Sequence, residues 1–488
     1  MTSLDIEPLR GQFVVSPEPV HDDDLTQTAT FQGLNVAAHP SLDLTYRTDG
    51  ENTILAIGTL LDPDHPDWTD GLVTDWLVRH LADGSFEAAL DSIGGRFVLL
   101  VAQGESLHVY GDACGTRSVF HGDAGGTWLA SQPGLLARHA GLHPDPRLAE
   151  LLDRTPTADS WPADLTPTPS VRMLLPNHRK CLRTGRVSRF WPRHHVRSLS
   201  LDDAAGVMAS TLRGLVDAAL NRGRVTVPTT GGYDSRMLLA AAWPRRKEIK
   251  TFTVVDAATP SHDVSLPLRL AVAGRLRHRV RHARPLPTST HEAIRSITGD
   301  VWRDPHEHRV LPFRHTKGSR VLLGHGSEIS RCASYEHGFA PEVVTPADLA
   351  GLTGWADEPR AVAALTRWLD GVPDCGIHPY DLSYWECRVG VWAALDSLVF
   401  ESFADPLSPF ACRRIHVAGL GVEATHRAYP WHLQRKVVEL LEPRLSRFPY
   451  NATSLTWLKT RIPAPVRRVV YVTRRRISGG SRGYTVLD

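Results

Sequence analysis

Lysine and closely spaced cysteines are what this chain has least of. Its six lysines are far outnumbered by arginine, which supplies nearly all of the 55 basic residues. No two of the six cysteines are separated by only two residues, which disfavours a zinc-ribbon site and fits a reducing compartment. There is also no Gly-Lys-Ser or Gly-Lys-Thr triplet, which excludes a Walker-type phosphate loop.

Long apolar runs and a large charge imbalance are absent too. No stretch of about 18 consecutive apolar residues predicts a membrane span. The first residues lack the basic and apolar regions of a signal peptide. A net charge of +2 gives no general attraction to nucleic acid or to a membrane surface. We therefore expect a cytoplasmic protein without a membrane span or a nucleic-acid partner, and 488 residues predict two or three globular domains.

The segment 226–243 carries the clearest functional pattern. It reads as a short strand, a turn with two glycines, and a helix that begins at Asp234. Glycines let the backbone approach an anion, and the N–H groups of a helix start favour phosphate. Without other support the same pattern fits a glycine turn before a capped helix. The candidate phosphate-binding residues are Thr229, Thr230, Gly231, Gly232, Tyr233, Asp234 and Ser235.

The segments that follow predict a parallel sheet. Lys250–Val255 is rich in β-branched residues and fits a buried strand. A polar turn over Asp256–Asp263 precedes the helical spacing of Val264–Gly274, with Pro267 expected in the first turn. Arg277–His282 is expected to form another strand, with its charges on a solvated edge. This alternation predicts a doubly wound sheet, whose ligands bind at the carboxyl ends of the strands.

Three later segments add to this pattern. A strand at Val321–Leu323 runs into Gly324-His-Gly-Ser-Glu328. Ala404–Ala411 has the sequence Ala-Asp-Pro-Leu-Ser-Pro-Phe-Ala, and Leu440–Leu445 reads Leu-Leu-Glu-Pro-Arg-Leu.

Together these motifs resemble the asparagine synthetase superfamily, which includes β-lactam synthetases and lasso-peptide cyclases. Thr230–Ser235 is similar to the Ser-Gly-Gly-x-Asp-Ser loop of ATP pyrophosphatases, and Gly324–Glu328 to a later acidic segment of the same family. The resemblance implies ATP and Mg²⁺, with Asp234 and Glu328 holding the metal on the pyrophosphate. It also implies that Val254, Gly324 and Gly326 border the nucleotide.

The first part of the chain resembles the glutaminase-type domain of the same family. The similar segments are Gly94–Phe97, Leu107–His121, Ala130–Leu136, Leu174–His178 and Arg189–Trp191. The resemblance implies an α/β protein with two domains. Residues 1–195 would form an Ntn-hydrolase-like αββα sandwich. Residues 196–488 would form a doubly wound ATP-pyrophosphatase domain, of the adenine nucleotide α hydrolase-like kind, that begins with a helix over Leu201–Asn221.

The first residues depart from the family pattern. A working glutaminase of this family begins with cysteine, whereas this chain begins Met-Thr-Ser. Unless processing exposes Thr2 or Ser3 as a nucleophile, we expect this domain to be inactive and glutamine not to be the nitrogen source. The resemblance then implies an amine from the substrate itself or from a second substrate, as in the lactam-forming members.

Two further departures concern the catalytic residues. His325 stands where asparagine synthetases carry glutamate and β-lactam synthetases a tyrosine, so it is either a general base or a histidine that only bonds ATP or caps the turn. Its partner is predicted to be Glu386, with Glu401 as a competitor. The late lysine of the family has no counterpart at its usual position. The candidates for its role on the α-phosphate are Lys459, Arg447 and Arg461.

The resemblance therefore implies an ATP-dependent, AMP-forming C–N ligase. It would adenylate a carboxylate and couple it to an amine, with lactam formation in a natural product such as a lasso peptide as the leading case. The substrate would be a small molecule or peptide, with a precursor peptide and its protease or leader-binding partner as further candidates. The alternatives are amidation with free ammonia or an amine donor, and a catalytically dead ATP-binding scaffold.

Overall fold

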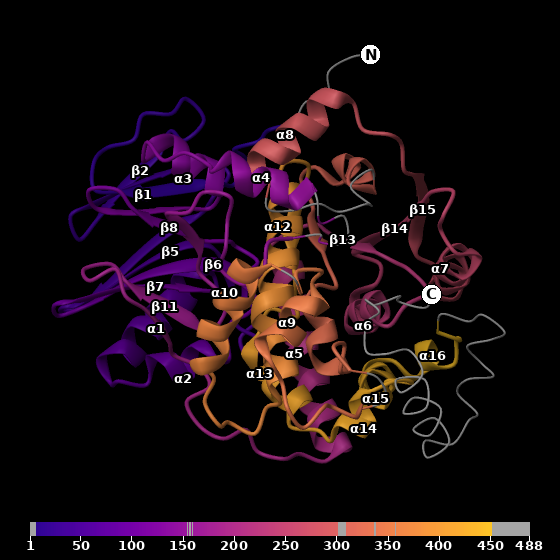
Figure 1. Cartoon of the computed structure of the whole chain (residues 1–488). Helices are drawn as coiled ribbons and strands as arrows, with labels where there is room; N and C mark the ends of the chain where they lie inside the picture. Colours follow the sequence, from indigo (N-terminus) through magenta and orange to yellow (C-terminus); the bar gives the residue numbers. More distant parts are fainter. Residues whose placement is uncertain are drawn as a thin grey trace.

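A computed structural model describes residues 6–450 except 154, 156, 157, 159, 301–308, 336, 337 and 357. Two antiparallel sheets form the first part of the chain, and a parallel sheet with many helices forms the rest (Figure 1). In the described part, no helix is long and apolar enough to cross a membrane.

The first part contains two six-stranded antiparallel sheets. One has the order β10-β8-β9-β1-β3-β2 and the other β12-β11-β7-β6-β5-β4. The strands of the first sheet are β1 (Phe13–Ser16), β2 (Gln27–Phe31), β3 (Leu34–Ala38), β8 (Phe120–Asp123), β9 (Thr127–Ala130) and β10 (Val171–Met173). Those of the second are β4 (Leu44–Asp49), β5 (Asn52–Leu61), β6 (Gly94–Gln103), β7 (Ser106–Gly111), β11 (His178–Cys181) and β12 (Val187–Arg189).

The two sheets pack face to face with helices outside them. Alternate residues of each strand, such as Val15 and Leu55, form a core between the sheets. Their neighbours Val14 and Ile54 point outward and are covered by helices. The covering helices are α1 (Asp70–Ala82) and α2 (Phe86–Leu90) on one side, and α3 (Pro133–His139) on the other, with α4 (Pro146–Asp153) next in the chain. The expected αββα layering of this part is confirmed.

The second part is built on a five-stranded parallel sheet with the order β15-β14-β13-β16-β17. Its strands are β13 (Val225–Pro228), β14 (Ile249–Val255), β15 (Arg277–His282), β16 (Arg320–Leu322) and β17 (Asp405–Leu407). Val225 and Leu322 face a core with helices α5, α6, α13 and α15, whereas Phe252 and Val321 face one that includes α8 and α12. Helices thus cover both faces, which confirms the expected doubly wound sheet.

The helices of this part start where the sequence signals them. Helix α5 (Leu201–Asn221) has the predicted bounds, and its first turn is capped by Ser200, which accepts a hydrogen bond from the N–H of Asp203. The others are α6 (Asp234–Ala241), α7 (Ser261–Gly274), α8 (Thr288–Thr298), α9 (Pro346–Leu352), α10 (Pro359–Asp370), α11 (Pro379–Ser383), α12 (Gly390–Glu401), α13 (Arg413–Leu420), α14 (Ala424–Arg427), α15 (His432–Leu441) and α16 (Pro443–Ser446). Short helical turns are η1 (Trp243–Arg245), η3 (Leu311–Thr316), η4 (Ser327–Arg331) and the π-helix η6 (Tyr384–Val389).

One prediction about α7 is wrong. The helix begins at Ser261 rather than Val264, so Pro267 lies inside it and not in the first turn. Pro260 is the residue before the helix and has an extended backbone, with its φ fixed by the proline ring. The polar residues 261–263 that follow it are already helical. As a result, Asp263 lies in the first turn of α7.

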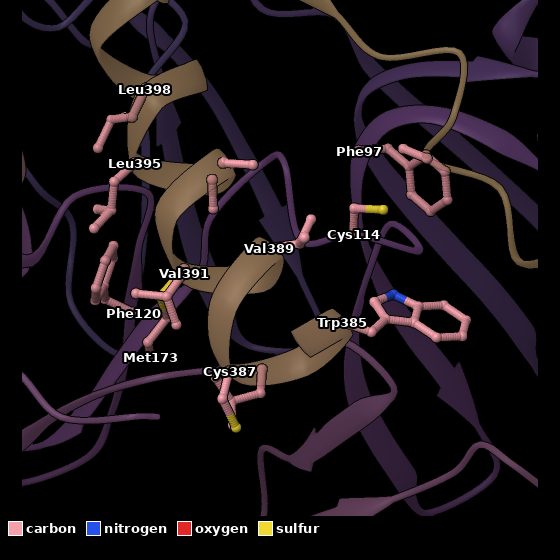
Figure 2. Close-up of a cluster of buried hydrophobic side chains, with 14 of the residues drawn as sticks. Phe97, Cys114, Phe120, Met173, Trp385, Cys387, Val389, Val391, Leu395 and Leu398 are labelled. Atoms are coloured by element: carbon pink, nitrogen blue, oxygen red, sulfur yellow. The ribbon is translucent and has the colours of Figure 1, made fainter. Parts of the chain in front are cut away.

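The continuous helix η6–α12 joins the two parts of the chain. In Figure 2, Val391 of this helix lies beside Phe120 and Met173 of the first part. The indole N–H of Trp385 donates to the carbonyl of Ala113 at 2.7 Å. The same helix runs through the middle of the molecule in Figure 1.

Candidate functional site

The candidate site lies where the strand order of the parallel sheet reverses. From β13 the chain proceeds to β14 on one side, and β16 pairs with β13 on the other. The loops after β13 and β16 therefore emerge beside each other at the carboxyl edge, the usual ligand position in such sheets. The predicted loop 229–235 and the predicted segment 324–328 are brought together here.

The glycine loop is held by hydrogen bonds within the protein. The N–H of Thr230 donates to the Ser235 hydroxyl at 3.0 Å, and the N–H of Gly232 donates to the Thr230 hydroxyl at 3.2 Å. The N–H of Gly231 donates to a carboxylate oxygen of Asp263 at 2.7 Å. An anion of the protein itself thus occupies one of the donors predicted to bind phosphate. Thr229, by contrast, faces inward and bonds the carbonyl of Val227 at 3.1 Å.

Asp234 and Glu328 lie close enough for the charge of Asp234 to affect the pKa of Glu328. Arg331 lies 3.2 Å from Oδ1 of Asp234 through its Nη1 atom. A β-carbon at Gly324 would lie 2.8 Å from the β-carbon of Asp234, so only glycine lets the two loops approach this closely. Burial raises the pKa of Glu328; Arg331 opposes this rise and Asp234 adds to it.

These two carboxylates fit a hard divalent cation. Oδ1 of Asp234 is buried without a hydrogen bond, although Arg331 is near it. Magnesium prefers one or two carboxylates completed by phosphate oxygens and water. No cluster of three or more His, Cys, Asp or Glu side chains suited to a metal occurs in the described ranges.

His325 is paired with Asp396, not with Glu386. Its Nε2 atom lies 2.9 Å from Oδ2 of Asp396 on α12, and its Nδ1 atom lies 3.5 Å from the Ser397 hydroxyl. The hydroxyl of Ser408, in the predicted segment 404–411, donates to the backbone carbonyl of His325 at 2.5 Å. Burial lowers the pKa of His325, but the hydrogen bond and charge of Asp396 outweigh burial, so the pKa is raised above 6.5.

The other two predicted glutamates hold the two parts of the chain together. Glu386 accepts hydrogen bonds from Asn177 at 3.0 Å and from the indole of Trp368 at 2.7 Å, and it also pairs with Arg189. Because both of its oxygens are used in these contacts, the structure does not bring it to His325. Glu401 also makes its contacts away from His325, with Arg96 and Arg117.

Glu401 forms a buried ion cluster with the first part. Arg96 contacts both of its carboxylate oxygens at 2.6 and 2.8 Å, and Arg117 donates at 3.1 Å. Gln12 adds a hydrogen bond at 2.9 Å. Burial raises the pKa of Glu401, but the two arginines outweigh it and the pKa is lowered.

Tyr233 points away from the loop that contains it. Its ring stacks on Tyr450 with a centroid distance of 4.1 Å, and its hydroxyl accepts from Arg435 at 3.0 Å. Arg236 donates to the carbonyls of Phe448 and Pro449 at 2.8 and 2.9 Å. Tyr233 and Arg236 therefore anchor the chain at residues 448–450.

The remaining predicted site residues are only partly placed. Val254 is half-buried near the end of β14, and Gly326 has a φ of 90° with the Cys114 sulfur 3.0 Å from where a β-carbon would be. Arg447 lies at the end of α16. Lys459 and Arg461 lie outside the described residues.

Sequence reasoning missed Asp263, Arg331 and Asp396. Only Asp396 left a signal, because it is a carboxylate within the apolar run Val391–Phe400 and is buried there. Tyr384, the first residue of η6, was also not predicted as a site residue. Burial and the charge of Glu328 raise the pKa of Tyr384, so its phenol lies near the Asp234–Glu328 pair.

Comparisons with known proteins give little further information. No family model and no curated protein matches the chain. A solved structure described as the allosteric regulatory enzyme of purine biosynthesis aligns with 62% of this chain and 87% of its own, at 10% identity and a TM-score of 0.25. Glutamine phosphoribosylpyrophosphate amidotransferase from B. subtilis, complexed with ADP and GMP, aligns with 66% and 72%, at 10% identity and a TM-score of 0.22. TM-scores this low carry no argument about fold or activity.

Proposed function

We propose that this chain is an ATP-dependent ligase that adenylates a carboxylate and joins it to an amine. The observation that carries the proposal is the meeting of Asp234 and Glu328 at the switch point of the parallel sheet, with His325 on the same loop as Glu328 and paired with Asp396 of α12. Such a site combines groups for a metal–phosphate complex with a base for an amine.

The first step is activation of the acid. A carboxylate oxygen of the substrate attacks the α-phosphorus of ATP, the bond from that phosphorus to the pyrophosphate bridging oxygen breaks, and pyrophosphate leaves with the bonding electrons. Asp234 and Glu328 would hold Mg²⁺, which when bound offsets the negative charge of the phosphates. Arg331, whose Nη1 atom lies 3.2 Å from Asp234, carries a positive charge that would stabilise a phosphate oxygen.

The second step is formation of the amide. The amine nitrogen attacks the acyl carbon, the bond from that carbon to the AMP oxygen breaks, and AMP departs. The proton lost by the amine goes to the imidazole of His325, and Asp396 stabilises the imidazolium that results. Lys459, the candidate for the family's late lysine, is proposed to act on the α-phosphate.

The amine belongs, in our proposal, to the same molecule as the carboxylate. A macrolactam in a ribosomal peptide, as in lasso-peptide cyclases, is the leading case, and a precursor peptide with its processing partner would accompany it. Amidation with free ammonia or a separate amine is the second candidate. A scaffold without activity is disfavoured, because scaffolding does not require two adjacent carboxylates at the edge of the glycine loop.

The test is ATP–pyrophosphate exchange with Mg²⁺ and a panel of carboxylates that includes peptides with Asp or Glu side chains. Asp234→Asn and Glu328→Gln should both abolish exchange. His325→Gln should retain exchange and lose amide formation, since it acts in the second step. Asp202→Asn, at an exposed position paired with Lys436, is the matched control and should behave like the wild type.

Two results would count against the proposal. Unchanged exchange in both carboxylate variants would remove the metal assignment. No exchange with any carboxylate, while ATP still binds, would favour the scaffold.

A further inference from the structure

Strand β15 is the outermost strand of the parallel sheet on the side of α7. It pairs in parallel with β14 over Arg277–His282, and among the described residues no strand pairs with its other edge. Within the described residues, the backbone N–H and C=O groups along that edge have no strand partner, as at other sheet edges that can accept a further strand.

Three arginines lie on one face of this strand. Arg277, Arg279 and Arg281 alternate along β15, so they share a face, and the register sets them beside Lys250, Phe252 and Val254 of β14. The opposite face carries His278, whose ring contacts the Thr251 hydroxyl at 2.9 Å.

Residues from another element extend this basic face. Phe252 packs on Phe313 of η3 at a centroid distance of 5.1 Å, which brings the next residues of η3 to the same side. Burial lowers the pKa of His315, and Arg281, Arg314 and Arg279 lower it further. Each of these three arginines therefore lies close enough to His315 to affect its charge.

No carboxylate neutralises this cluster within the described part of the chain. Arg277, Arg279, Arg281 and Arg314 have no ion pair there, and all of them except Arg281 are exposed. Repulsion among them is unfavourable in the free protein and would be relieved by an acidic partner.

Protection of the sheet edge does not account for all of these features. Charges on an edge strand discourage unwanted pairing. That purpose is served by β15 alone and does not require Arg314 and His315 on η3. It also does not explain Val280, which is 36% exposed in the middle of the strand.

We propose that β15 binds an extended acidic peptide segment as an added strand. Backbone hydrogen bonds to the open edge would supply affinity, and acidic side chains at alternate positions would pair with Arg277, Arg279 and Arg281. Arg281 is level with Val254 at the carboxyl end of the sheet, so the bound segment would lead toward the glycine loop. Only the identification of this segment as part of the substrate rests on the proposed function; the binding itself does not.

The test uses two labelled peptides of one composition. In the first, Glu alternates with Thr; in the second, the same Glu residues are contiguous. Fluorescence anisotropy without ATP should show tighter binding of the alternating peptide, by roughly tenfold. Arg279→Glu and Arg281→Glu should each remove this preference. Arg186→Glu, which reverses an exposed charge in the turn before β12, should retain it.

Three outcomes would overturn the proposal. They are equal binding of the two peptides, unchanged binding by Arg279→Glu, and equally tight binding of a single-stranded oligonucleotide, which would mark a general polyanion surface. ATP–pyrophosphate exchange with a small carboxylate tests the proposed chemistry separately from peptide binding. If Arg279→Glu retains this exchange but no longer binds the peptide, β15 binds peptide independently of the active site.

Discussion

His325 and Asp396 form a base–carboxylate pair between the loop after β16 and helix α12, with 2.9 Å between Nε2 and Oδ2. The contact fixes the orientation of the imidazole and stabilises its protonated form. It also makes the histidine sensitive to the position of α12.

Asp396→Asn should move the pH dependence of amide formation. Neutral His325 is the base, so the rate should rise with pH through a pKa above 6.5. Removing the Asp396 charge lowers this pKa, so the rise should begin at lower pH, while the maximal rate should fall on the order of tenfold or more. Single-turnover rates from pH 5 to 9 measure both. Ser397→Ala, which changes the weaker contact at Nδ1, is the control; an unshifted profile in Asp396→Asn would exclude the pair as the base.

Asp263→Asn should strengthen ATP binding. The Asp263 carboxylate occupies the Gly231 N–H at 2.7 Å and competes with a phosphate for it. Asparagine can still accept this hydrogen bond but carries no charge, so affinity should rise roughly threefold to tenfold. Isothermal titration calorimetry with Mg·ATP measures the change, with Glu248→Gln at the surface as control. Weaker binding would mean that Asp263 instead supports the bound nucleotide.

Mg·ATP binding should weaken as pH falls toward the pKa of Glu328. Only the ionised carboxylate binds the metal, and burial raises its pKa above 4.5. The loss of affinity should therefore begin at higher pH than for an ordinary glutamate. Titrations from pH 5 to 8 would show the slope, and Glu328→Gln should bind weakly with a flatter pH dependence. The same slope in the variant would assign the titration to another group.

Glu401→Gln should destabilise the fold. Losing the carboxylate leaves Arg96 and Arg117 buried without their counter-charge, which costs about 3 kcal/mol or more. Urea unfolding measures this change, and Glu7→Gln at the surface should have little effect. The lowered pKa of Glu401 means that its stabilisation is present above pH 4.5 and is lost as pH falls through the folded pKa. The variant should therefore lose less stability on acidification, and a wild-type response would contradict the assignment.

Local patterns predicted the elements of the fold better than the contacts of the site. The bounds of α5 and the start of α6 follow from apolar spacing and helix-capping residues, which act within a few residues. Asp396 meets His325 across 71 residues of sequence, and Glu401 meets Arg96 across 305. Such distant pairings depend on how helices pack, which a single sequence does not encode in any short pattern.

The loop residue Tyr233 shows the same difference. Its glycine neighbours predict a turn from backbone freedom alone, and the turn is present. The direction of its ring depends on Tyr450 and Arg435, more than 200 residues later. Proximity to the glycine turn therefore did not determine the contacts of this side chain.

Helix α12 makes the first 195 residues inseparable from the remainder. A fragment that began at residue 196 would expose Val391 and Leu395, now buried, and would leave Glu401 without either arginine. A gene that lost the two sheets would need polar residues at 391 and 395 and a neutral one at 401 before its product could fold. Natural selection would then retain the sheets as the foundation of the part built on the parallel sheet, whether or not they have a chemistry of their own.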